Sequence, residues 1–195
     1  MDFEYKRIGL FGGSFNPVHR GHLLVAQAAK EELCLERLFF IPAAQSPFKP
    51  DMELAPAKDR LRLLRLALCG YSFCEIDDQE LVRGGVSYTI DTLKNYSKKY
   101  HGAELFYLIG ADHASLLPKW RQAEELAQIA TFAVVPRPGQ SVIALLPPFR
   151  GVELKGCPMA ISSSRIRERV RMGLTLKGMV PDTVADSIQN FRLYL

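Results

Sequence analysis

Two histidines, His19 and His22, are the residues with the clearest chemical potential. They close the segment GGSFNPVHRGH at residues 12–22. Imidazoles three residues apart lie on the same side of a helical turn, so both can donate hydrogen bonds to one phosphate group. The preceding glycines let backbone approach a ligand closely, and the free N–H groups at a helix start attract phosphate. The segment therefore predicts a phosphate-binding loop; a tight turn beside two surface histidines is the alternative.

Such a loop needs a strand before it and a helix after it, and the surrounding sequence supplies both. Short apolar runs alternate with helix-period segments, a pattern typical of βαβ units around a mostly parallel sheet. The predicted strands are 7–11, 38–41, 73–76, 105–109, 131–135 and 152–154. The predicted helices are 22–33, 58–69, 88–100 and 121–128, with further helices from about 163 and about 181. The fold class expected is α/β, with helices on both faces of the sheet.

Composition places the chain among ordinary globular proteins. It has 195 residues, 48% hydrophobic and 24% charged, with a net charge of +4, and we expect one domain over residues 1–195. No apolar run approaches the ~18 residues of a membrane span, and the acidic opening lacks the character of a signal peptide, so we expect a cytoplasmic protein. The four cysteines have neither zinc-site spacing nor C-x-x-C pairs, which favours reduced thiols over a metal site or disulfides.

Two segments resemble those of the nucleotidyltransferase superfamily. Residues 14–22 resemble its H-x-G-H signature, and ISSSRIR at 161–167 resembles its I-S-S-[ST]-x-I-R segment, which opens a helix and contacts ATP phosphates. The resemblance implies a Rossmann-like nucleotidyltransferase fold. The residues themselves also indicate an anion site at a helix start. A serine cluster is a good helix cap, and arginines in a first turn oppose the helix dipole unless an anion lies there. A capped, solvated helix is the alternative for this segment.

Further segments resemble the bacterial nicotinate-nucleotide adenylyltransferase family. These are SYTIDTL at 87–93, GAD at 110–112 followed by LPKW at 117–120, VPRPG at 135–139, and IPAAQSPFK at 41–49. From the residues alone, Ser87 is expected to cap a helix, and Trp120 could be either a core residue or a stacking platform. Phe48 replaces the family's common His, and Asn16 stands where many members have Asp.

The resemblance implies adenylyl transfer from ATP to nicotinate mononucleotide, with pyrophosphate released and Mg²⁺ carried in with ATP. It implies His19, His22 and Arg167 as catalytic residues and no metal ligands from the protein. The ATP-binding residues implied are Gly12, Gly13, Ser14, Phe15, His19, His22, Gly110, Asp112, Ile161, Ser163, Ser164 and Arg167. The substrate-binding residues implied are Lys49, Ser87, Tyr88, Thr89, Trp120 and Arg137.

Other functions compete with this interpretation. Within the enzymes, the rivals are adenylyl transfer to another phosphomonoester, such as phosphopantetheine, and cytidylyl transfer. A non-catalytic nucleotide sensor is disfavoured by the intact histidines and Arg167, and a nucleic-acid binder by the lack of a recognised motif or dense basic patch. A class I aminoacyl-tRNA synthetase is excluded by length and by the lack of a K-M-S-K-S-like segment. The sequence leaves the preference for nicotinate over nicotinamide open, and it allows a homo-oligomer.

Overall fold

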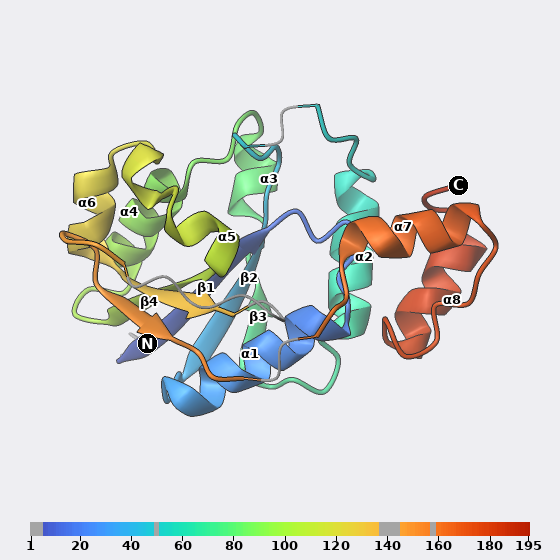
Figure 1. Ribbon diagram of the computed structural model, residues 1–195, viewed down its shortest axis with the longest axis horizontal. Coiled ribbons are helices and arrows are strands. Elements are labelled where there is room, and N and C mark those ends of the chain that lie inside the picture. Colours follow the sequence, from blue (N-terminus) through green and yellow to red (C-terminus); the bar gives the residue numbers. More distant parts are fainter. Residues whose placement is uncertain (1–5, 49–50, 137–144, 157–158) are drawn as a thin grey trace.

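A parallel sheet forms the centre of the molecule (Figure 1). The computed structural model describes residues 6–48, 51–136, 145–156 and 159–195. Within these residues six strands pair in the order β3-β2-β1-β4-β5-β6, every pair parallel. The strands are β1 Arg7–Gly13, β2 Arg37–Pro42, β3 Cys74–Ile76, β4 Glu104–Gly110, β5 Thr131–Val135 and β6 Gly151–Glu153. The predicted mostly parallel α/β sheet is confirmed, and each predicted strand is present within two residues of its expected ends.

The order of the strands reverses at β1, because β2 pairs on one side of it and β4 on the other. The chain therefore leaves β1 and β4 in opposite directions, which opens a crevice at their carboxyl ends. In doubly wound sheets this switch point is where ligands bind. The predicted phosphate-binding loop follows β1 and so starts at this crevice.

Helices cover both faces of the sheet. They are α1 Arg20–Glu32, α2 Ala57–Ala67, α3 Gln79–Arg83, α4 Thr89–Lys99, α5 Ala111–Ala114, the 3-10 helix η1 Leu117–Lys119, α6 Ala123–Ile129, α7 Ser163–Arg171 and α8 Asp182–Asn190. The sequence did not predict α3, α5 or η1, because five or fewer residues are too few to display a helical period. Figure 1 shows α7 and α8 beside α2, at the opposite end of the molecule from α4 and α6.

Alternation along the strands divides the core between the two faces. On β2, Leu38 and Phe40 pack with α1, α2 and α7, whereas Phe39 and Ile41 pack with α4 and α6. The strand is therefore apolar at consecutive positions, as expected for a parallel sheet buried on both sides. This two-sided burial holds the carboxyl ends of the strands, and the loops that leave them, in fixed places.

One local prediction is wrong. Ser87 does not cap a helix, because α4 begins at Thr89 with Tyr88 at the N-cap position. The Ser87 hydroxyl instead accepts a hydrogen bond from the Ala44 N–H at 2.9 Å. The segment after β2 pairs with the segment before α4, and this pairing also includes the Gln45–Val86 bridge. The Ser87 hydroxyl is part of this long-range pairing and therefore does not cap α4.

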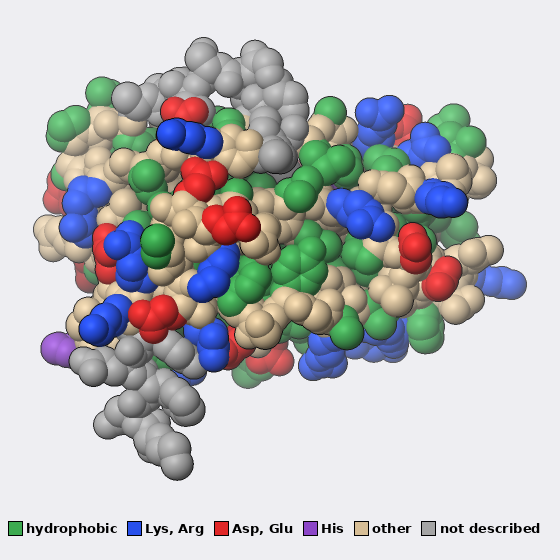
Figure 2. Space-filling view, turned by 90° about the horizontal axis from the view of Figure 1, so that it is seen from below, with side chains coloured by type: hydrophobic (Ala, Val, Ile, Leu, Met, Phe, Trp, Pro, Cys, Tyr) green, Lys and Arg blue, Asp and Glu red, His purple; other side chains and the backbone are tan. Residues whose placement is uncertain are grey.

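The surface seen in Figure 2 carries Lys and Arg side chains interspersed with Asp and Glu, rather than one continuous basic stripe. In the described part of the chain, no helix has the length and apolar character needed to cross a bilayer.

Candidate active site

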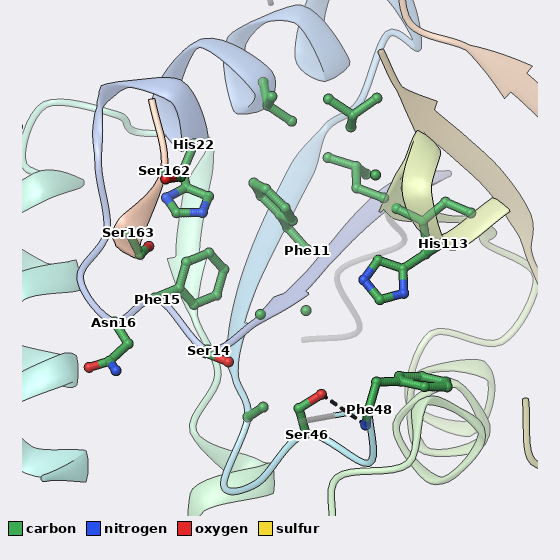
Figure 3. Close-up of a pocket in the computed structure, with 18 of the residues that line it drawn as sticks. Phe11, Ser14, Phe15, Asn16, His22, Ser46, Phe48, His113, Ser162 and Ser163 are labelled. Atoms are coloured by element: carbon green, nitrogen blue, oxygen red, sulfur yellow. Dashed lines mark hydrogen bonds between the residues drawn. The ribbon is translucent and has the colours of Figure 1, made fainter. Parts of the chain in front are cut away.

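A cavity of about 390 Å³ lies at the carboxyl ends of the central strands. Its walls come from the β1 loop (residues 14–19), the β2 loop (residues 43–48), the first turn of α1, the end of β4, Trp120 and the start of α7. Figure 3 shows His22, Ser162 and Ser163 on one side of this cavity, and His113 and Phe48 on the other. The volume is within the range of ligand pockets.

The two histidines form one unit at the start of α1. His19 is the N-cap residue, and its ring stacks on that of His22 with the ring centroids 3.7 Å apart. The backbone N–H of His19 donates to Nδ1 of His22 at 3.1 Å. Since Nδ1 of His22 accepts this bond, the proton of the neutral ring belongs on Nε2. The backbone thus fixes both the place and the tautomer of His22 beside the positive end of a helix.

Arg167 comes from the far end of the chain and joins the same wall. Its Nη1 donates to the Asn16 carbonyl at 2.8 Å, and its Nη2 donates to the Ser164 hydroxyl at 3.2 Å. One turn earlier, the Ser163 hydroxyl donates to the Pro17 carbonyl at 2.8 Å. Ser162 caps α7 by accepting from the Arg165 N–H, so the serine cluster begins a helix as predicted. These bonds fasten α7 to the β1 loop.

The β1 loop is shaped by close contacts that few residues could make. A Cβ added to Gly12 would lie 2.2 Å from the Tyr107 hydroxyl, so only glycine permits that approach. Phe15 has a φ of 44°, in the left-handed region that non-glycine residues seldom occupy. Its ring is 2% exposed and packs at 5.5 Å from Phe11 and 5.4 Å from Phe40, which holds the unusual backbone in place.

Aromatic side chains line the opposite wall. The Trp120 ring lies 5.7 Å from Phe48, 6.2 Å from Tyr107 and 6.3 Å from His113, measured between centroids. The indole N–H is buried and has no hydrogen-bond partner among the described residues. A buried donor without a partner is costly, so this N–H is available to a polar group of a bound ligand.

A buried carboxyl group lies at one end of the cavity. Glu80 is 4% exposed and accepts a hydrogen bond from the Thr92 hydroxyl at 2.6 Å. Burial raises its pKa, and hydrogen bonds from Thr92 and Ser87 oppose that effect in part. Nearby, the Thr89 hydroxyl donates to the Tyr107 hydroxyl at 3.2 Å.

Comparison with known proteins agrees with this geometry. The family model described as Cytidylyltransferase-like matches residues 10–169. A probable nicotinate-nucleotide adenylyltransferase of Geobacillus kaustophilus is 39% identical over 188 residues, covering 96% of this chain and 86% of the relative. Another, from Opitutus terrae, is 40% identical over 190 residues, covering 96% of this chain and 97% of the relative.

The chain belongs to the nicotinate-nucleotide adenylyltransferase family. The Plasmodium falciparum nicotinic acid mononucleotide adenylyltransferase in complex with NaAD has the same fold, with a TM-score of 0.81 at 19% identity, covering 97% of this chain and 98% of that one. The Rossmann-like nucleotidyltransferase fold expected from the sequence is therefore confirmed.

Most of the family-implied site residues meet in one place. Arg167 and the two histidines line the same cavity although they lie at opposite ends of the sequence. The other predicted residues that line it are Gly12, Gly13, Ser14, Phe15, Ser87, Thr89, Gly110, Trp120, Ile161, Ser163 and Ser164.

Four predicted residues stand apart from this group. Tyr88 and Asp112 are not among the residues that line the cavity; the Tyr88 ring lies 4.6 Å from the Arg121 guanidinium, and the Asp112 carboxylate lies 3.8 Å from His113 Nε2. Lys49 and Arg137 lie outside the described residues. The roles of these four, like those of the residues that line the cavity, stay predictions.

Several cavity residues were not predicted from the sequence. Phe11, Glu80, Tyr107 and His113 line the cavity without belonging to any quoted motif, and Ser46 lies within the quoted segment 41–49 but was not predicted as a site residue. The only usable signal was position, because Tyr107 and His113 flank the carboxyl end of β4, where α/β sheets bind their ligands. Glu80 gave no such signal, since a lone glutamate in a short polar stretch is typical of a solvated surface.

The described residues contain no group of three or more His, Cys, Asp or Glu side chains that could hold a metal ion. Hydroxyl groups, imidazoles and the Arg167 guanidinium line the cavity beside the β1 loop. These groups fit a divalent metal ion whose ligands are mainly nucleotide phosphates and water rather than protein side chains.

Proposed function

We propose that this chain transfers the adenylyl group of ATP to nicotinate mononucleotide, giving nicotinate adenine dinucleotide and pyrophosphate. The observation that carries the proposal is the convergence of His19, His22 and Arg167 on a cavity whose other wall contains Trp120. One wall offers hydrogen-bond donors and a cation to a triphosphate, and the other offers a flat aromatic surface to a pyridine ring.

In this proposal, a 5′-phosphate oxygen of the mononucleotide attacks the α-phosphorus of ATP in line. The new P–O bond forms as the bond to the β-phosphate oxygen breaks, and that oxygen leaves with the electron pair as part of pyrophosphate. No protein nucleophile is needed, because the attacking phosphate is already an anion. The protein's contribution is positioning together with neutralisation of charge on the phosphate oxygens.

In this proposal, each group of residues binds the phosphates nearest to it. His19 and His22 hold the α- and β-phosphates, with Nε2 of His22 as a donor. Arg167 and the hydroxyls of Ser163 and Ser164 hold the leaving pyrophosphate. A magnesium ion carried in by ATP adds charge neutralisation when bound.

At the other end, Trp120 stacks on the pyridine ring while the segment from Ser87 to Thr89 receives the carboxylate. The first-turn N–H groups of α4 are donors, which a carboxylate needs and a carboxamide uses less fully. We therefore expect nicotinate mononucleotide to be preferred over nicotinamide mononucleotide. Lys49, Tyr88, Asp112 and Arg137 complete the proposed set. The cytoplasmic location and the absence of a nucleic-acid partner stay predictions from the sequence.

The test is to incubate the protein with ATP, Mg²⁺ and either mononucleotide, and to follow pyrophosphate release. We expect release with nicotinate mononucleotide to be the faster of the two. The Arg167→Gln variant, prepared in the same way, should release little pyrophosphate, and any release that it shows measures contaminating activity. Arg171→Gln is its matched control, because Arg171 is exposed on the same helix. Equal or greater release with the nicotinamide substrate would contradict the specificity, and no release with either would contradict the function. Release with phosphopantetheine instead would favour the rival enzyme.

A further inference from the structure

Arg60 is a buried cation behind the candidate site. It lies on α2, is 2% exposed and is not among the residues that line the cavity. Burial lowers the pKa of its guanidinium. Within the described ranges no carboxylate forms an ion pair with it. Burying a cation without such a partner is unfavourable unless its donors are satisfied with good geometry, so the partners of Arg60 indicate its use.

Those partners are backbone carbonyls of three separate segments. Nη1 donates to the Ser14 carbonyl and to the Ala43 carbonyl, each at 2.8 Å. Nε donates to the Ala55 carbonyl at 3.1 Å. One guanidinium thus joins the β1 loop, the β2 loop and the segment that leads into α2.

Hydrogen bonds of Asn16 also join the β1 loop to the segment that leads into α2. The Asn16 side chain donates to the Glu53 carbonyl at 3.1 Å and accepts from the Ala55 N–H at 3.0 Å. On the other side, Arg167 holds the Asn16 carbonyl. The β1 loop is therefore fixed by Arg167 from the side of the cavity and by Arg60 from behind it.

The two loops that Arg60 joins serve different substrates in the proposed reaction. The β1 loop leads into His19 and His22, which face the ATP phosphates, whereas the β2 loop carries Ser46 and Phe48 beside Trp120. The distance between these loops sets the distance between the attacking phosphate and the α-phosphorus. A displacement of about 1 Å between reacting groups can lower a rate by about 10²-fold.

We propose that Arg60 is a positioning residue that fixes the β1 loop against the β2 loop and so aligns the two substrates. The alignment of substrates rests on the proposed function, whereas the joining of the loops does not. Lysine cannot replace it, because a single ammonium lacks the planar fork that spreads donors between Nε and Nη1.

The first experiment compares Arg60→Lys with Arg62→Lys. Arg62 is the matched control, because it lies on the same helix and pairs with Asp59 at 2.7 Å but contacts neither loop. At a temperature well below the unfolding midpoint of each variant, Arg60→Lys should lower kcat about 10- to 100-fold while KM for either substrate changes less. Arg62→Lys should keep wild-type kcat. A folded Arg60→Lys protein with wild-type kcat would overturn the proposal, because a purely structural role would move only the midpoint.

Hydrogen–deuterium exchange gives a readout that needs no turnover. Faster exchange at the Ala43 and Ala55 amides in Arg60→Lys, but not in Arg62→Lys, supports the joining of the loops, and unchanged exchange contradicts it. If wild type releases no pyrophosphate, the proposed function fails while this readout still decides the role of Arg60. If Arg60→Lys does not fold, NMR of the wild-type protein decides: a slowly exchanging Arg60 Nε–H supports the proposal, and a signal that exchanges like those of surface arginines overturns it.

Discussion

A hydrogen bond from the backbone of a residue three positions earlier holds the His22 ring. The His19 N–H bond to Nδ1 directs the ring and places its proton on Nε2, so the side chain is a fixed donor before any ligand arrives. A donor that needs no reorganisation stabilises developing charge more effectively than one that must first be oriented. The stacked His19 ring restricts rotation of His22 in the same way.

Replacing His22 tests this donor. We expect His22→Ala to lower kcat for adenylyl transfer by about 10²–10³-fold, the usual effect of losing one transition-state donor. His101→Ala is the control, because His101 is exposed and lies outside the cavity lining. Steady-state kinetics of pyrophosphate release measures both variants, and a His22→Ala enzyme as fast as wild type would show that the ring does not contact the reacting phosphates.

The sequence predicted His19, His22 and Arg167 as parts of one site because their motifs are contiguous and lie at helix starts, and all three line one cavity. It could not identify Arg60, whose partners Ser14 and Ala43 lie 46 and 17 positions away, or Glu80, whose burial depends on the packing of α3 against α4. In the sequence, Arg60 is one of several polar residues in the amphipathic segment that forms α2. Its burial depends on the loops that fold over it, and no local pattern encodes them.

At the level of elements, β1 and β4 pack closely because Gly12 leaves room for the Tyr107 hydroxyl. We expect Gly12→Ala to destabilise the protein by about 1–3 kcal/mol, the usual cost of overpacking. Tyr107→Phe in the same chain should recover part of this loss, because it removes the atom that the new methyl group meets. Denaturant unfolding of the wild type, both single variants and the double variant gives the coupling. Additive effects would show that the hydroxyl is not the obstacle.

Glu80 links α3, α4 and the segment before α4 through Thr92 and Ser87, and this link makes stability depend on pH. Burial raises the Glu80 pKa above its ordinary value of 4.5, so the folded protein keeps this proton to higher pH than the unfolded chain. The contribution of Glu80 is therefore fully present below pH 4.5 and is lost as the pH rises through the folded pKa.

Glu80→Gln should accordingly gain stability relative to wild type as the pH rises above about 4.5, because the amide keeps an acceptor for Thr92 and never ionises. Thermal unfolding midpoints of both proteins between pH 3.5 and pH 8 measure the effect. Asp77 and Arg83 also act on Glu80 and are present in both proteins, so the difference isolates one carboxyl group. A difference that does not change with pH would contradict the prediction.

The sequence predicted helices and strands correctly where a segment was long enough to show its hydrophobic period. It failed where contacts with distant residues set the end of an element. Strands such as β4 are continuous apolar runs, and helices such as α2 show a clear apolar face, so both could be read locally. The start of α4 could not, because the Ser87 hydroxyl bonds to Ala44, a residue 43 positions away.

For the whole molecule, the two apolar clusters share the strands of one sheet, which couples the helices on either face. We propose that residues 1–195 unfold as one domain, in a single thermal transition. A non-hydrolysable ATP analogue at ~100 times its Kd should add ~2.7 kcal/mol and raise the midpoint by roughly 5–10 °C without splitting the transition. Calorimetry with and without the analogue measures this, and two separate transitions would contradict a single domain.

The bond between Arg167 and the Asn16 carbonyl spans 151 positions of the chain. During synthesis, the glycines and histidines leave the ribosome long before the guanidinium that completes their wall. A nascent polypeptide that ends before residue 167 therefore lacks the guanidinium that we propose holds the ATP phosphates, whatever the state of its sheet. The wall shared by α1 and α7 is therefore complete only after the α7 segment has left the ribosome.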